Sequence, residues 1–371
     1  MIELLKGKFD NKHFVNLSYD LFKALEIKHK EKNSVFCPLG VDACLGVLHS
    51  GAEGETKKEI ENVIGLERKK HLQYLKTIMA SNIALVKNLF LSRGFELGRD
   101  FDRECREYLN TTLQNVVEID NITEWVNEWV EENTNGFLNG FDEVIVDPLT
   151  FYNLVYFKEK WMDEFEKARK ESFTTPSGNE QVDMMKLKDG NGVRYIGNYS
   201  REHNIGYEGV RIKYRDVNAS MICLMSDNRE EHVYDWYEKL PKKLWLEIMN
   251  SSKNSDVEIY LPKFEVENEY ELNDVIMSLG IQLPFDRVNA NLSRINPNAT
   301  RLYVERTRQK AKIKTDEKGT EAAAVTEMQF RYASVNRNTV VRFNRPFMYM
   351  VMDDTLNVPL FMGIVNNPNK S

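Results

Sequence analysis

The sequence has few cysteines and no long apolar run. Its 371 residues include only four cysteines, and their spacing fits neither paired metal ligands nor a disulfide framework. We therefore expect free thiols at Cys37, Cys44, Cys105 and Cys223. No apolar stretch reaches membrane-spanning length, and residues 1–8 lack the apolar core of a signal peptide. The chain as given is predicted to have no membrane span, and to be cytoplasmic, exported without a leader, or extracellular if a leader was removed.

Motifs of common catalytic sites are also missing. The sequence contains no G-x-S-x-G, H-E-x-x-H, Walker, G-x-G-x-x-G or C-x-x-C pattern. Acidic pairs such as Asp353-Asp354 are explained more simply as turns than as acid/base dyads. We expect no metal site and no cofactor, so an enzyme is the less favoured class. Surface or capping roles, rather than metal ligation, are expected for all six histidines, His13, His29, His49, His71, His203 and His232.

The charge balance excludes a surface built wholly for nucleic acid. The chain carries 50 Lys and Arg against 57 Asp and Glu, a formal net charge of −7, which favours solubility. The densest basic cluster is Arg68-Lys69-Lys70-His71. A solvated loop or the start of a helix is the favoured interpretation of this cluster, and a glycosaminoglycan contact through Arg68, Lys69 and Lys70 is the alternative.

Hydrophobic periodicity predicts a mixture of helices and strands without regular alternation, which is an α+β chain. With 42% hydrophobic residues and no repeat, linker or low-complexity block, we expect one domain over residues 1–371. Thr56 is predicted to cap a short helix that runs to Ile64. Further helices are predicted at 13–30, 41–48, 123–134, within 234–249 and at 272–279, and strands at 85–92, 116–119, 151–157 and at many positions after 182.

The segment 316–326, Asp-Glu-Lys-Gly-Thr-Glu-Ala-Ala-Ala-Val-Thr, supports two interpretations. Thr320 is a good N-cap and alanine is the best helix former, so propensity predicts a helix. However, the following residues show no helical apolar stripe. In a strand, Thr320, Ala322, Ala324 and Thr326 would share one face of small side chains. Because no proline occurs from 317 to 340, this segment could pair within a sheet on both sides.

Several other blocks occur together with this segment, and as a set they resemble the serpins, a family of serine protease inhibitors. The similarity extends along nearly the whole chain in the order of the family. The matching blocks are 33–40, 126–130 with 134–136, 153–158 with Trp161, 261–264, 279–281, 343–347, and 360–365 with Pro368.

The resemblance implies the α+β serpin fold, with about nine helices around three β-sheets and an exposed reactive-centre loop at about 317–340. In serpins the target protease cleaves this loop, remains attached as an acyl-enzyme, and is trapped when the loop inserts into the main sheet. The resemblance places the hinge of that loop at Glu317, Gly319, Thr320, Ala322, Ala323, Ala324 and Thr326.

The small inward face of this hinge favours an inhibitor over the alternative, a non-inhibitory serpin that acts as a carrier or chaperone. The expected partner is a serine protease bound covalently to a monomer, with no nucleic acid.

The region beneath the opening of the sheet departs from the family pattern. Its residues here are Cys37, Pro38, Gly40, Asn153, Trp161, Lys263 and Gln309. Cys37 and Gly40 stand where the family usually has serines, and Gln309 stands where it usually has a histidine that bonds the residue at Asn153. Glutamine can still donate to an amide oxygen. We expect this region to be looser than usual and to be tightened by serine at both sites, and we expect Glu317 to contact Lys263.

The scissile bond is placed by counting. In the family about sixteen residues, a reach of ~3.3 Å each, separate the hinge glutamate from the residue read by the protease, which gives Ala333 followed by Ser334. Counting back from Phe343 gives a position about two residues later. Ala333 suits an elastase-like pocket and Tyr332 a chymotrypsin-like one. Arg331 or Arg337 would suit trypsin-like enzymes but requires an unusual loop length, so these targets rank lower.

Overall fold

The computed structural model describes residues 10–26, 32–81, 83, 85–94, 96–188, 190–251, 257–298, 301–320 and 339–370. Nine α-helices and three β-sheets occur within these ranges, which confirms the α+β class. The chain divides into two compact units. The first contains residues 1–25, 37–156 and 268–312, and the second contains 26–36, 157–267 and 313–371. No helix among the described residues is long and apolar enough to cross a membrane.

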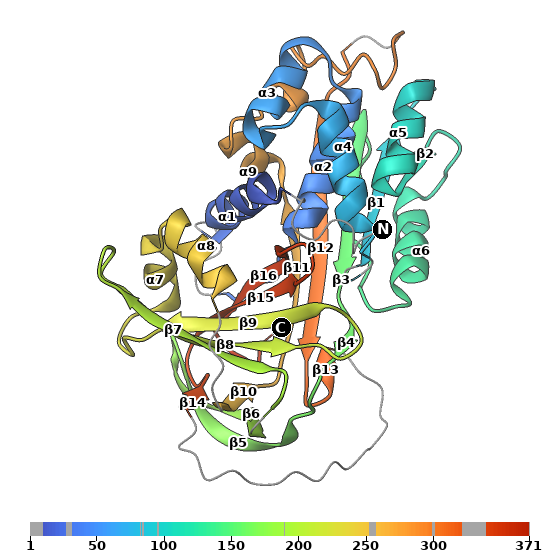
Figure 1. Ribbon diagram of the computed structural model, residues 1–371. Coiled ribbons are helices and arrows are strands. Elements are labelled where there is room, and N and C mark those ends of the chain that lie inside the picture. Colours follow the sequence, from blue (N-terminus) through green and yellow to red (C-terminus); the bar gives the residue numbers. More distant parts are fainter. Residues whose placement is uncertain are drawn as a thin grey trace. The chain divides into compact units, whose positions relative to one another are not determined.

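The first unit contains one sheet in the order β2-β1-β3-β12 (Figure 1). Strand β1 (Leu85–Ser92) pairs parallel with β2 (Thr111–Asn115) and antiparallel with β3 (Leu149–Tyr156). Strand β12 (Val304–Thr315), which continues into the second unit, pairs parallel with β3 in a register that sets Gln309 opposite Asn153. These pairings place Asn88, Asn153 and Gln309 on adjacent strands.

Helices of the first unit enclose this sheet. Helix α6 (Ile122–Thr134) buries Val126, Trp129 and Val130 in a cluster with Tyr152 and Leu154 of β3, because these apolar residues recur at helical spacing. Helix α2 (Pro38–Gly51) is buried along its whole length and begins with proline at its first position, where the missing N–H is not needed. The other helices are α1 (Lys12–Glu26), α3 (Gly54–Ile64), α4 (Arg68–Met79), α5 (Arg99–Leu109) and α9 (Asn273–Ser278).

The second unit contains two further sheets. The four-stranded sheet has the order β14 (Thr339–Arg342), β10 (Val257–Pro262), β6 (Gly178–Lys188) and β5 (Glu166–Thr175). The five-stranded sheet has the order β16 (Val358–Val365), β15 (Phe347–Asp353), β9 (Ala219–Ser226), β8 (Ile205–Lys213) and β7 (Val193–Ser200). Strands β9, β15 and β16 are buried throughout, as expected for near-continuous apolar runs.

The described part of the second unit also contains two helices, and three strands that belong to neither of these two sheets. They are α7 (Val233–Lys239), α8 (Lys242–Asn250), β4 (Glu159–Lys160), β11 (Phe264–Glu271), which ends in the first unit, and β13 (Gly319–Thr320).

Two local predictions were wrong. Helix α3 begins at Gly54, so Thr56 lies inside it, buried, with its hydroxyl accepting from the Asn291 N–H at 2.9 Å. Residues 116–119 form a turn after β2 rather than a strand. There the Asn115 side chain accepts from the N–H of Val117 at 3.2 Å, and such side-chain bonds compete with strand pairing.

Candidate functional site

The predicted hinge begins with a tight hairpin in the second unit. Asp316 accepts through Oδ1 from the N–H groups of Lys318 at 2.8 Å and Gly319 at 3.2 Å, and its own N–H bonds Gly319 O at 2.9 Å. The turn sets Thr320 opposite Thr315 of β12, and β13 also pairs with β4. Gly319 and Thr320 therefore form a short strand that is paired on both sides. The residues after Thr320, for which propensity predicts a helix, lie outside the described residues.

Gly319 is required by close backbone contact. A Cβ atom at this position would lie 2.3 Å from Glu159 O and 2.7 Å from Lys160 Cα, and backbone atoms cannot move aside as a flexible side chain can. The glycine that the hinge pattern has at residue 319 is therefore explained by this lack of space for a Cβ atom.

Thr320 is fully buried, and its Oγ1 lies 2.9 Å from the hydroxyl of Tyr214. The Tyr214 ring stacks on Trp161 with centroids 4.6 Å apart and an interplanar angle of 14°. Trp161 in turn donates from Nε1 to Asp316 O at 2.9 Å. Burial raises the pKa of Tyr214 well above its usual value, so this hydroxyl stays protonated. Tyr214, which sequence reasoning missed, is a direct contact of the hinge.

Glu317 contacts Lys263, as the sequence predicts, with 2.6 Å between the charged atoms. Its other oxygen accepts from the Ala168 N–H at 3.0 Å. Burial opposes ionisation of Glu317, but the hydrogen bonds from Lys263 and Ala168 outweigh it, so the pKa of this carboxyl lies below its usual value. The glutamate is therefore a fixed anion at the base of the hinge.

In the first unit, Gln309 is the centre of a buried amide network. It donates from Nε2 to Asn153 Oδ1 and to Cys37 O, both at 2.9 Å, and accepts through Oε1 from the Cys37 N–H at 2.9 Å. Asn153 donates to Asn88 Oδ1 at 2.8 Å. All these groups are buried, so each hydrogen bond avoids the cost of an unsatisfied polar group. Glutamine here ties β3 and β12 to the start of α2.

Cys37 and Gly40, where serines were expected to tighten this region, each have a defined contact. The Cys37 sulfur accepts from the Gly40 N–H at 3.3 Å and caps α2. Burial raises the pKa of Cys37 to about 12, so it remains a thiol. A Cβ atom at Gly40 would lie 2.0 Å from Asn153 Oδ1 and 2.6 Å from Gln309 Nε2. A serine at residue 40 would therefore have to displace the amide pair, and whether it tightens the region stays a prediction.

The scissile-bond candidates Arg331, Tyr332, Ala333, Ser334 and Arg337 lie outside the described residues, and so do the hinge residues Ala322, Ala323, Ala324 and Thr326. Of the predicted site residues, the structure thus describes the start of the hinge in the second unit and, separately, the paired strands β3 and β12 in the first unit.

The family model for serpins (serine protease inhibitors) matches residues 12–368. The chain belongs to the serpin family. It is 30% identical to neuroserpin from Gallus gallus, over 98% of this chain and 93% of that protein, and 30% identical to neuroserpin from Homo sapiens, over 97% and 92%. The family relationship makes this serpin a relative of protease inhibitors and not of enzymes.

Solved serpin structures share this fold. Native protease nexin-1 with heparin has a TM-score of 0.85 at 23% identity, covering 96% of this chain and 99% of that one. Human thyroxine-binding globulin complexed with thyroxine has a TM-score of 0.84 at 21% identity, covering 96% and 98%. The first of these proteins is a protease nexin with heparin and the second a thyroxine-binding globulin with thyroxine, so the fold alone does not separate an inhibitor from a binding protein.

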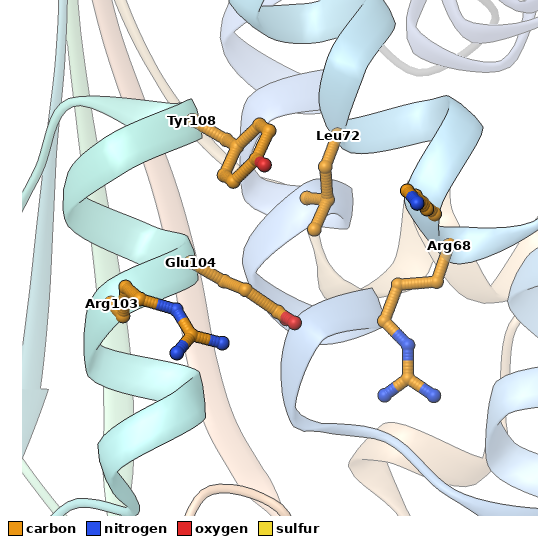
Figure 2. A pocket seen from close by; sticks show the side chains of 6 residues that line it. Arg68, Leu72, Arg103, Glu104 and Tyr108 are labelled. Atoms are coloured by element: carbon orange, nitrogen blue, oxygen red, sulfur yellow. The ribbon is translucent and has the colours of Figure 1, made fainter.

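A cavity of about 220 Å³ lies in the first unit of this serpin, between α4 and α5 (Figure 2). Figure 2 shows Arg103, Glu104 and Tyr108 reaching from α5 toward Leu72 on α4. Arg68 and Lys69 complete the lining. Two of its cations have ion-pair partners outside the cavity, Arg68 with Glu53 at 2.9 Å and Arg103 with Asp100 at 2.8 Å. The basic run 68–70 does start a helix. Arg103 and Tyr108, which belong to the same cavity, were missed because they lie on a separate helix.

The predicted surface or capping role of the histidines holds for His232, which accepts from the Tyr234 N–H at the start of α7. It is wrong for His49 and His71, which are fully buried in the first unit and lie against each other. Their polar neighbours in sequence suggested exposure, whereas packing of α2 on α4 covers both rings.

Proposed function

We propose that this serpin inhibits serine proteases by inserting its cleaved reactive loop between β3 and β12. The observation that carries the proposal is the hinge: Gly319 and Thr320 already pair beside β12, while β3 and β12 are direct neighbours over Val304 to Lys312. Insertion would extend a pairing that has begun. We further propose that the chain acts as one monomeric domain.

Continuing the pairing of Thr315 with Thr320 gives the register of the inserted strand. Ala322 would face Ile313, Ala324 would face Ala311, and Thr326 would face Gln309. Because side chains alternate across a strand, these small residues would share the buried face. The intervening residues would share the opposite face, with Glu321 beside Lys314 and Glu327 beside Arg308. The small side chains on the buried face and the opposite charges paired on the other face both favour insertion.

The chemistry belongs to the protease. Its serine oxygen attacks the Ala333 carbonyl, an ester forms, the bond to Ser334 breaks, and the new amino group takes the proton. About 13 residues at ~3.3 Å would then carry the ester about 43 Å from the hinge. Elastase-like and chymotrypsin-like enzymes are the proposed targets, ahead of trypsin-like ones.

Incubation with elastase, chymotrypsin and trypsin tests the proposal. An SDS-resistant complex with one of them is expected, and sequencing of the released C-terminal peptide identifies the bond. Thr320→Arg is the matched variant, because a long charged side chain cannot enter the buried space beside Tyr214. It should be cleaved without forming a complex. Cleavage of the wild type without any complex by all three enzymes would favour the carrier function, for which thyroxine-binding globulin is the structural precedent.

A polyanion is the second proposed partner, at the cavity between α4 and α5. Lys69 and Lys70 are exposed, whereas Arg68 is largely engaged with Glu53 at 2.9 Å. We expect Lys69→Glu combined with Arg103→Glu to abolish binding to immobilised heparin at physiological salt, since each lost cation removes a counterion-release contribution. Lys170→Glu in the second unit is the control. Equal retention of both variants would contradict this site.

A further inference from the structure

Four buried or half-buried groups of the first unit form a continuous chain of contacts. Asp42 Oδ1 lies 3.0 Å from His71 Nε2, and His71 Nδ1 lies 3.2 Å from His49 Nδ1. His49 Nε2 lies 3.4 Å from Glu61 Oε1. Asp42, His49 and His71 are completely shielded from solvent, and the Glu61 side chain is 22% exposed. The chain links α2, α3 and α4.

The three contacts among these four side chains require one more proton than two neutral histidines and two carboxylates carry. Each of the three contacts needs a hydrogen between its two heavy atoms. Two neutral imidazoles supply only two hydrogens, and two carboxylates supply none. A third proton is therefore required wherever it is placed.

The surroundings fix the place of this proton. Glu61 also accepts from the Arg68 N–H at 3.3 Å and lies 3.5 Å from Lys57 Nζ, so it is an anion that receives a hydrogen from His49. Burial, together with the charges of His71, Arg68, Lys57 and Arg294, lowers the pKa of His49 to about 2. His49 is thus neutral. The remaining position lies between Asp42 and His71, where a bare buried carboxylate would be costly.

We propose that Asp42 and His71 share one buried proton at neutral pH, and that this proton ties α4 to α2. The proton sits either on His71, as an imidazolium beside a carboxylate, or on Asp42, as an acid beside a neutral ring. In both forms all three contacts are made. The other titratable or charged groups facing this chain are Asp10, His13 of α1, Lys57 of α3, Arg68 and Tyr74 of α4, and Arg294.

Because of the shared proton, the free energy of unfolding should fall as the pH rises into the alkaline range. Above the ordinary histidine value of about 6.5, the unfolded chain releases this proton while the folded chain keeps it. Because the folded state then binds more protons, the equilibrium constant for unfolding rises by about tenfold per pH unit from this site. The tie between α2 and α4 is weakest in alkaline solution.

Asp42→Asn provides a near-isosteric test. The second oxygen of Asp42 has no hydrogen-bond partner among the described residues, so an asparagine can turn its amide N–H toward His71 Nε2. The amide hydrogen replaces the shared proton, all three contacts remain, and nothing is left to titrate. Glu61→Gln is the control, because its amide oxygen still accepts from His49 and leaves the shared proton in place.

The measurement is the number of protons released on unfolding at about pH 8, obtained calorimetrically in buffers of different ionisation enthalpy. Wild type and Glu61→Gln should each release about one proton more than Asp42→Asn. Equal release by wild type and Asp42→Asn would overturn the proposal. If Asp42→Asn fails to fold, NMR of the wild type decides: a neutral His71 ring together with an ionised Asp42 carboxylate at about pH 8 overturns it. No protease is needed, so the result is independent of inhibitory function.

Discussion

Gln309 and Asn153 lie opposite each other on β12 and β3, and their side-chain amides are joined by a 2.9 Å hydrogen bond in a fully buried position. Gln309 also makes two hydrogen bonds with the backbone of Cys37. One side chain thus joins two strands and a helix start. In the proposed mechanism β3 and β12 must separate, so this contact has to be broken when the loop inserts.

Replacing Gln309 by alanine should lower the free energy of unfolding by about 3 kcal/mol, because it leaves several buried polar groups without partners. Gln309→His is the matched variant, since the imidazole keeps one donor and should lose less. Urea unfolding of the uncleaved chain measures both. Equal losses would show that volume, rather than hydrogen bonding, determines the effect.

Serine at residues 37 and 40 should change the stability by different amounts. Cys37→Ser keeps a side-chain acceptor at the cap of α2 and should change stability by less than about 1 kcal/mol. Gly40→Ser places a side chain against Asn153 and Gln309, and overpacking of this kind costs about 1–3 kcal/mol. Thermal unfolding of the two single variants separates them. A stabilised Gly40→Ser would mean that the amide pair moves aside without cost.

Glu327→Lys should impair trapping without affecting the fold. In the proposed inserted register Glu327 lies beside Arg308, whose guanidinium is already held by Glu269 at 3.2 Å. Two cations at adjacent positions repel each other and slow insertion. More inhibitor molecules should then be cleaved per protease trapped, with Glu327→Gln intermediate. An unchanged stoichiometry for both variants would contradict this register.

Arg342 is predicted to hold the far end of the reactive loop. Its guanidinium lies 3.5 Å above the Tyr260 ring and pairs with Glu171, while β14 has only four residues, three of them not buried. Arg342→Gln should therefore release β14 more readily and allow slow insertion of the uncut loop. Loss of inhibitory capacity on storage, with a rise in thermal stability, is the expected sign. Lys186→Gln removes a cation 5.4 Å from the same ring. This variant should lose much less inhibitory capacity on storage and show a much smaller rise in thermal stability.

Acid should destabilise the chain through His49. The pKa of this ring is lowered to about 2 by burial and by neighbouring charges, so the folded state takes up no proton there while the unfolded state does so below about pH 6.5. The unfolded state then binds more protons, and stability falls as pH drops, by ~1.4 kcal/mol per unit. At about pH 5 the loss is about 2 kcal/mol. His49→Gln should flatten this slope between about pH 6.5 and 4, and an unaltered slope would assign the acid sensitivity to other groups.

Sequence patterns were sufficient where local chemistry and periodicity act together. Strand β1 was predicted with its observed limits, and α6 within one residue, because their apolar spacing matches the burial they achieve. Thr56 and residues 116–119 were assigned wrongly because the deciding hydrogen bonds come from Asn291, distant in sequence, and from the side chain of Asn115. Local propensity does not contain such contacts.

The sequence by itself determined the family and the α+β class, since these depend on ordered motifs and on hydrophobic periodicity. The position of the hinge stays a prediction from its small, proline-free residues. Only the tertiary structure decided that Thr320 is already seated beside Tyr214, that Gly40 makes room for the Asn153–Gln309 pair, and that His49 and His71 are buried partners. Apart from the two histidines, which are 22 positions apart on separate helices, these relationships join residues 106 to 269 positions apart. Long-range packing brings them together, and neither composition nor spacing along the chain records it.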